Sequence, residues 1–235
     1  MKPLAVVYGS SSSIAKALIE KMNDQYRVIG VSRSGEECGA AEGQFSSDFS
    51  EQSLADITAE IAEDSGPIEL AVCAVGLLHS DSVNPEKRLA DITASGLSSY
   101  FHVNSIIPAL ILKELAACMD RQKPCRMVFL SAKIGGIGDN RLGGWYGYRS
   151  SKAALNMLVK TAAVEFSRSS RKACAVVMHP GTTDTPLSEP FTGNVSEDKL
   201  YSPATTAGRL FEVIEQLGPD DSGRFLNWDG TDLPW

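Results

Sequence analysis

Short apolar runs alternate with amphipathic segments along the chain. Residues 4–7 are apolar, residues 14–22 repeat apolar positions at helical spacing, and residues 26–31 are apolar again. A strand, a helix and a second strand within about 30 residues form a βαβ unit, so a parallel sheet is predicted. Later segments are predicted to add strands at 44–48, 68–75, 126–131, 174–179 and 224–228.

Helical spacing of apolar residues recurs between these strands. The fold class predicted by this alternation is α/β, a three-layer, doubly wound parallel sheet of about seven strands, the Rossmann arrangement. We expect residues 1–235 to form a single domain, because α/β chains of this length commonly remain undivided. The predicted helices are 50–62, with Ser50 and Ser53 as caps near its start, 97–119, one from 149 onward, and 204–217.

Two loops are predicted at the carboxyl edge of the sheet, where open α/β folds bind their ligands. A glycine-rich loop at 132–147 follows the predicted strand 126–131. A polar segment at 187–203 follows the strand 174–179. We predict that this second segment is a mobile flap over the same edge.

The composition excludes several classes of function. The chain has 22 Lys and Arg against 29 Asp and Glu, a net charge of −7, and no basic run, so nucleic acid is not an expected partner. The apolar start is too short for a signal-peptide core, and no apolar run approaches the ~18 residues of a membrane span. We expect a soluble, cytoplasmic protein without a membrane partner.

The cysteines and histidines do not predict a metal site. Five cysteines lack C-x-x-C spacing, and three of them lie in or beside apolar runs, so reduced core cysteines are favoured over a disulfide or zinc framework. The three histidines are scattered without ligand spacing, and no metal is assigned.

Tyr148 and Lys152 lie four residues apart at the start of a predicted helix, which places both on one face. An ammonium near a phenol favours the phenolate, so we expect the pKa of Tyr148 to fall below its ordinary value near ~10. Such a tyrosine can give or take a proton at neutral pH. The neighbouring Tyr146 has Ser150, not a lysine, at its fourth position. Such a spacing also arises by chance, and in that alternative Tyr148 packs and Lys152 is solvated.

Asn104 lies inside the predicted helix 97–119, four residues before Pro108. Proline has no N–H, so the carbonyl of Asn104 is expected to lose its partner within the helix and to become free for water or a side chain. Without that role, Asn104 is ordinary polar surface.

The segment after the first predicted strand is where dinucleotide folds place glycines against the pyrophosphate. Gly9 is retained, while Ser13 and Ala15 occupy the places of the other two glycines. Both residues are small, and hydroxyls at a helix N-terminus suit a phosphate. The alternative is a serine-rich cap without a ligand. The candidate cofactor contacts in this segment are Gly9, Ser11, Ser12, Ser13 and Ile14.

The second predicted strand ends in Ser32 and Arg33, where NAD-selective folds usually carry an acidic residue for the ribose hydroxyls. An arginine at this place can instead pair with a 2′-phosphate. NADP is therefore favoured, with NAD possible, although a strand-end arginine can also be plain surface.

Together these features resemble the short-chain dehydrogenase/reductase family over nearly the full length of the chain. The resemblance rests on the strand order, Tyr148-x-x-x-Lys152, Asn104, Gly9 and Pro180-Gly181. Within the family, the bacterial C-factor-type members, which act in cell–cell signalling, are similar at further segments. These segments are 131–135, 139–145, 179–181 and 228–235.

The resemblance implies an NAD(P)-dependent oxidoreductase that reduces or oxidises a small carbonyl or alcohol by hydride transfer. Tyr148 would be the acid or base at the substrate oxygen, and Lys152 would bind the nicotinamide ribose and lower the tyrosine pKa. Asn104 would hold a water in a proton relay to Lys152. A serine hydroxyl, from Ser131, would help Tyr148 to stabilise the developing oxyanion.

The resemblance also implies further cofactor contacts beyond the glycine segment. Asp48 would contact the adenine, Arg33 the adenosine phosphate, and Gly76 would form the turn beside the adenosine ribose. Thr185 would contact the carboxamide or the pyrophosphate. The remaining implied contacts are Pro180, Gly181 and Thr182.

Two segments depart from the family pattern. The family serine lies three residues before a glycine, and Ala132 holds that place here with Ser131 just before it. Either the loop shifts so that Ser131 serves, or the hydroxyl is missing. The polar N-N-A-G pattern of the family is replaced by residues 73–76, Cys-Ala-Val-Gly, which removes polar anchors below the cofactor.

Two other functions compete with the oxidoreductase. A C-factor-like signalling or nucleotide-binding protein would keep the fold and bind cofactor with little turnover. S-adenosylmethionine-dependent methyl transfer would require an acidic residue where Ser32 and Arg33 stand, and it is disfavoured.

Assembly and substrate are less defined by the sequence. The helices predicted at 97–119 and from 149 onward carry more apolar surface than one sheet face requires, and the family equivalents pair into a four-helix contact, so a homodimer or homotetramer is expected. Core burial alone would give the same pattern. The small-molecule substrate is not specified, although Arg141, Trp145, Phe191 and the flap are candidates for its pocket.

Overall fold

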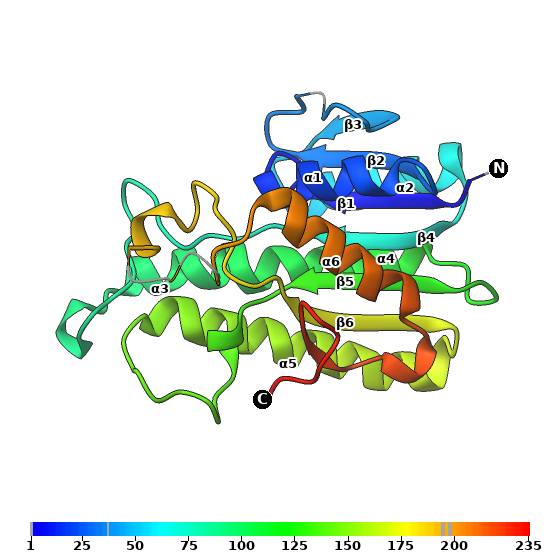
Figure 1. The fold of residues 1–235 in the computed structure, drawn as a ribbon. Helices are drawn as coiled ribbons and strands as arrows, with labels where there is room; N and C mark the ends of the chain where they lie inside the picture. Colours follow the sequence, from blue (N-terminus) through cyan, green and yellow to red (C-terminus); the bar gives the residue numbers. More distant parts are fainter. Residues whose placement is uncertain (1, 37, 194–195, 197–198) are drawn as a thin grey trace.

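The computed structural model describes residues 2–36, 38–193, 196 and 199–235. Seven parallel strands form one sheet in the order β3-β2-β1-β4-β5-β6-β7 (Figure 1), which confirms the predicted fold class. The order reverses between β1 and β4, because the chain first builds outward to β3 and then returns to the other side of β1. The strands are β1 (Leu4–Tyr8), β2 (Arg27–Ser32), β3 (Gly43–Ser46), β4 (Ile68–Cys73), β5 (Cys125–Leu130), β6 (Ala173–His179) and β7 (Phe225–Asn227).

Helices cover both faces of the sheet and make a three-layer structure (Figure 1). The pair α1 and α6 packs on one face and on each other, whereas α2, α4 and α5 pack on the opposite face. Each strand supplies side chains to both layers, which explains why the central strands are continuous apolar runs. The helices are α1 (Ser13–Met22), α2 (Glu51–Ser65), α3 (Ala94–Phe101), α4 (Ile107–Cys118), α5 (Tyr146–Ser169) and α6 (Pro203–Gln216).

Serine caps fix the starts of the first two helices. Ser12 accepts a hydrogen bond from the N–H of Ala15 at the start of α1, and Ser50 accepts one from the N–H of Ser53 at the start of α2. The cap predicted for the second helix is thus confirmed. The serine run also ends the turn after β1 at a defined residue, which aims the N-terminus of α1 at the carboxyl edge of the sheet.

The helix predicted at 97–119 begins earlier and contains a wide turn. α3 and α4 are joined by a π-helical segment, His102–Ile106, in which the N–H of Ile107 bonds the carbonyl of His102. Pro108 follows at once, and its missing N–H together with its ring disfavours a regular α-turn. The combined helix at 94–118 is long and apolar enough to pass a membrane-span test by length and composition, but it packs against α2 and α5 as a core helix.

Two loops rise from the carboxyl edge, at the left of Figure 1. One contains the polar insert after β4, and the other is the predicted flap at 187–203, in which Glu189–Phe191 forms a short 3₁₀ turn. Residues 194–195 and 197–198 of the flap lie outside the described residues. The mobility of the flap stays a prediction.

Candidate active site

Two adjoining pockets form a cleft along the carboxyl edge of the sheet. One, of about 300 Å³, is bounded by the segments after β1, β4, β5 and β6, and the other, of about 360 Å³, extends from β1 and β4 to the ends of β2 and β3. They share a wall made by Ser11, Ser12, Ala74, Val75 and Gly76. The cleft therefore crosses the sheet where the strand order reverses, as expected for a dinucleotide site.

Most of the predicted site residues line one or both of these pockets. The first is lined by Ser131, Tyr148, Lys152, Pro180 and Thr185, and also by Ser13 and Ile14. The second is lined by Gly9, Arg33 and Asp48. Together with Gly76 in the shared wall, candidate residues from seven segments of the sequence are thus gathered into one elongated cleft.

The turn after β1 leaves space that only glycine fits. Gly9 has φ +80°, and a Cβ there would lie 2.9 Å from the carbonyl carbon of Ala74. The next segment presents the N-terminus of α1 and the Ser11, Ser12 and Ser13 side chains to the cleft. Such an end carries free N–H groups and a positive dipole that suit a pyrophosphate, so the residues present fit a dinucleotide even with two of the usual glycines replaced.

Tyr148 and Lys152 both lie at the first pocket and are buried, with 9% and 4% of their surfaces exposed. Lys152 donates a hydrogen bond to the carbonyl of Leu130, 2.9 Å away, at the end of β5. Burial lowers the pKa of Lys152 to about 8, because a charged amine loses its water.

The expected fall in the pKa of Tyr148 is wrong for this structure. Burial raises the pKa of Tyr148 to about 12, because the phenolate would be desolvated. The Lys152 amine is bound to the Leu130 carbonyl, and its charge does not offset that cost. Tyr148 is therefore held as a neutral phenol, a proton donor.

Asn104 lies at the wide turn between α3 and α4 and is fully buried. Its side chain donates to the carbonyl of Leu77 and the hydroxyl of Ser151, and it accepts from the N–H of Leu77. Asn104 therefore links the segment after β4 to α5 through hydrogen bonds, and it is not a surface residue. The free main-chain carbonyl expected for Asn104 stays a prediction.

Ser131 lines the first pocket, but its hydroxyl is committed. It donates to the amide oxygen of Asn156 on α5, 2.6 Å away. Ala132 packs against the cluster that contains Tyr148 and has no hydroxyl to offer. Ser131 is near the site, and its direct role at a substrate stays a prediction.

The outer pocket has polar groups suited to an adenosine. Arg33 and Asp48 are exposed just after β2 and β3, and Ser32, the last residue of β2, is buried and lines the same pocket. The Ser50 hydroxyl, followed by the Ser50 N–H that donates to Asp48, lowers the pKa of Asp48, so this carboxyl is anionic at neutral pH. One cation and one anion therefore frame this end of the cleft.

Two predicted contacts line neither pocket. Gly181 has φ +82° and packs against Trp228, and the carbonyl of Thr182 accepts from the N–H of Tyr201. Both residues shape the turn after β6 that leads to the flap, and Arg141 is exposed on its loop away from the cleft lining.

Glu86, from the polar insert, is a site residue that the sequence did not reveal. Its side chain is only 6% exposed and accepts from the N–H of Gly147, 3.0 Å away, in the first turn of α5. Its main-chain carbonyl accepts from the N–H of Trp145. A lone glutamate in a polar segment gives no pattern, yet this one fixes the helix end that carries Tyr148.

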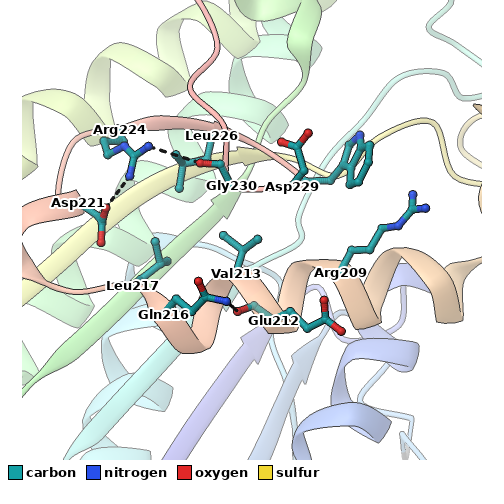
Figure 2. Close-up of a pocket in the computed structure, with 11 residues that line it drawn as sticks. Arg209, Glu212, Val213, Gln216, Leu217, Asp221, Arg224, Leu226, Asp229 and Gly230 are labelled. Carbon is teal, nitrogen blue, oxygen red and sulfur yellow. Dashed lines mark hydrogen bonds and ion pairs between the residues drawn. The ribbon is translucent and has the colours of Figure 1, made fainter.

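Another hollow lies away from this cleft, between α6 and the segment around β7 (Figure 2). It has a volume of about 550 Å³ and shares no lining residue with the two cleft pockets. Its charges are of both signs, and Arg224 is paired with Asp221. Tyr148 and Lys152 are not among the described residues that line this hollow.

A doubly wound sheet with a cleft across the strand reversal, glycine at the first turn and a helix N-terminus facing the cleft defines a dinucleotide-binding α/β protein. A family model described as short chain dehydrogenase matches residues 3–195. The chain belongs to this family, whose members are oxidoreductases, and the resemblance drawn from the sequence is confirmed.

The chain is similar to several curated proteins. It is 29% identical to C-signal of Myxococcus xanthus over 147 residues, which cover 63% of this chain and 83% of that protein. It is 26% identical to 1-hydroxy-2-glutathionyl-2-methyl-3-butene dehydrogenase of Rhodococcus sp. (strain AD45) over 186 residues, which cover 79% of this chain and 76% of that one. The C-factor-type likeness is thus supported.

Solved structures share the fold at low sequence identity. Carbonyl reductase Sniffer of D. melanogaster matches with a TM-score of 0.85 and 18% identity, and each chain is covered in full. An NADPH-bound carbonyl reductase from chicken fatty liver matches with a TM-score of 0.84 and 20% identity, again over the whole of both chains. These matches establish the architecture.

Proposed function

We propose that this protein is an NADP-preferring reductase or dehydrogenase of a small carbonyl or alcohol, with Tyr148 as the acid or base. The observation that carries the proposal is the meeting of Tyr148, Lys152 and the α1 N-terminus at one pocket of about 300 Å³. A nicotinamide cofactor bound along the cleft would supply or accept the hydride.

The residues of the chain have separable tasks in this reaction. Tyr148, neutral because burial raises its pKa, would donate its proton to a carbonyl oxygen as negative charge develops there. Lys152 would hold a ribose hydroxyl and return a proton to the Tyr148 phenolate. A pKa of about 8 for Lys152 suits this proton transfer near neutral pH. Asn104 and Ser151 would keep the Leu77 segment and α5 in register around this pair.

NADP is preferred in this proposal because of the outer pocket. Arg33 is exposed there beside Ser32, which suits a 2′-phosphate, and Asp48 faces the same pocket from β3. Similar proteins with the same fold were solved with NADP or NADPH bound, which supports the choice. NAD stays possible at lower affinity.

The decisive experiment is NADPH oxidation with a panel of aldehydes, ketones and quinones, followed in the Tyr148→Phe variant. Turnover should fall by roughly 10² to 10⁴, the usual contribution of a positioned acid, while NADPH binding by fluorescence titration persists. Tyr146→Phe is the matched control, because Tyr146 lies two residues away with its side chain outside the cleft lining. Turnover that survives in Tyr148→Phe would refute the mechanism.

A second candidate is a signalling protein that binds the cofactor with little turnover. The identity of 29% with C-signal favours it, and so does the bonding of the Ser131 hydroxyl to Asn156 beside Ala132. This candidate predicts NADPH binding that requires Arg33 but no substrate turnover above the rate of the Tyr148→Phe variant.

We also propose that the protein acts as a cytoplasmic homodimer or homotetramer. Apolar side chains are exposed along α5 and at the wide turn of the preceding helix, among them Met157, Leu158, Val164 and Ile106. Light scattering coupled to size exclusion tests this point, since a monomer at micromolar concentration would reject it.

A further inference from the structure

Three aromatic side chains lie near Tyr148. Trp145 contacts its ring, Phe191 packs against the apolar cluster that contains it, and His79 contacts Phe191. Trp145 precedes α5, Phe191 lies on the flap, and His79 lies in the insert after β4. We call these three residues the aromatic cover. The ring centroids of Trp145 and Phe191 are 5.0 Å apart, those of His79 and Phe191 are 5.7 Å apart, and those of Trp145 and Tyr148 are 6.2 Å apart.

The backbone holds Trp145 in an unusual conformation. Gly143, Gly144 and Trp145 have φ values of 65°, 65° and 55°, so a bulky residue occupies the left-handed region at a cost of roughly 1 kcal/mol or more. The N–H of Trp145 donates a hydrogen bond to the carbonyl of Glu86, and this bond stabilises the conformation. Strain of this kind persists only where the surroundings require the side chain in that place.

The cover joins a residue held by backbone hydrogen bonds to a residue on the predicted flap. Trp145 is anchored through Glu86, whose carboxylate also binds Gly147 in α5. Phe191 lies on the predicted flap and contacts His79 of the insert, and just before the flap the carbonyl of Pro186 is hydrogen-bonded to Nε2 of His79, 3.0 Å away. A substrate ring that displaces Phe191 would meet a Trp145 ring held in place by the bond to Glu86.

Apart from the α1 N-terminus, which the proposed cofactor would occupy, the space beside Tyr148 offers little to an ionic substrate. Among the described residues that line the first pocket, Lys152 is the only charged one, and its amine is bound to the Leu130 carbonyl. Arg149 donates to the carbonyls of Gly144 and Ile134. A carboxylate buried here would lose its water, and the one cation in the described lining is already bound to the Leu130 carbonyl.

We infer that the substrate is uncharged and carries a flat apolar ring next to its carbonyl, which stacks on Trp145 in place of Phe191. This inference rests on the proposed function and names the substrate class of the same site. Aromatic pairs at centroid distances of about 4.5–7 Å gain free energy beyond that of area burial alone. A substrate ring stacked on Trp145 therefore recovers the free energy that is lost when Phe191 leaves this position.

Two matched pairs of aldehydes test the inference through NADPH oxidation. Methyl 4-formylbenzoate and 4-formylbenzoate differ in charge but little in size, and kcat/KM should be at least about 100-fold higher for the ester. Benzaldehyde and cyclohexanecarbaldehyde have similar sizes but a flat and a puckered ring. The ratio of their kcat/KM values should fall about tenfold in Trp145→Ala and recover in Trp145→Phe.

The controls separate this inference from the proposed function. Leu142→Ala alters a side chain that is 91% exposed on the same loop, and it should leave both ratios unchanged. The substrate class is overturned if the ester and the carboxylate are turned over equally, or if Trp145→Ala does not alter the ratio of kcat/KM values for the flat and the puckered ring. Turnover that still depends on Tyr148 would support the proposed function in that case. If no aldehyde shows Tyr148-dependent turnover although NADPH binds, both proposals fail.

Discussion

Lys152→Met should make the protein more stable at pH 7 while removing its activity. Lys152 is buried with its pKa lowered from 10.5 to about 8, so the folded state holds its charge at a cost. At about 1.4 kcal/mol per pKa unit, that cost is roughly 3 kcal/mol at pH 7. Methionine has a similar length and no charge, so the variant avoids the cost.

One contact is lost in return. The Leu130 carbonyl loses the donor that Lys152 supplies at 2.9 Å, and such a loss costs about 1 kcal/mol. The free energy of unfolding should therefore rise by roughly 2 kcal/mol at pH 7.

The sign of the pH dependence follows from the direction of the pKa change. The folded-state pKa of Lys152 lies below the unfolded value, so the unfolded chain binds more protons between about pH 8 and 10.5. The penalty is fully present below pH 8 and is relieved as the pH rises through this window. At pH 10 it should fall below about 1 kcal/mol, and the two proteins should converge in stability.

Urea unfolding of both proteins without added cofactor, at pH 7 and pH 10, measures this difference. Lys16→Met, at an exposed position on α1, is the matched control and should change stability by at most about 0.5 kcal/mol. The reasoning would be refuted if Lys152→Met is less stable than the parent at pH 7. It would also be refuted if the gain in the free energy of unfolding is as large at pH 10 as at pH 7.

Three further predictions concern other parts of the site. Arg33→Ala should weaken NADPH binding at least tenfold and leave NADH binding nearly unchanged in fluorescence titrations, and equal losses for both would contradict the phosphate role. Ala132→Ser should raise kcat several-fold by adding a hydroxyl beside Tyr148, because Ser131 already donates to Asn156, and an unchanged kcat in a folded variant would argue against that placement. Glu86→Ala should lower the free energy of unfolding by 1 to 3 kcal/mol, roughly the cost of an unpaired buried N–H at Gly147, whereas Glu86→Gln should lose less, and equal losses would show that charge rather than the hydrogen bond matters.

The fold was largely predictable because its signals are local. Apolar runs such as 68–75 mark buried parallel strands, and the cap at Ser50 follows from residue type alone. The spacing of Tyr148 and Lys152 likewise places both side chains on one turn of α5. Such features depend on residues only a few positions apart.

Features that depend on distant segments were not predictable. The pKa of Tyr148 was expected to fall, but burial under side chains from the insert and the flap raises it. The role of Glu86 depends on a contact across 61 positions of sequence, for which no periodic pattern exists. The side-chain bonds of Asn104 to Leu77 and Ser151 are equally non-local.

The π-helical turn at His102–Ile106 sets a constraint on the length of this chain. A π-turn contains one residue more than an α-turn, so deletion of a single residue there would restore a regular helix and rotate everything beyond it by about 100°. Asn104 could then reach Leu77, or the apolar side of α4 could meet the sheet, but not both. The segment should therefore tolerate substitutions far better than a one-residue deletion.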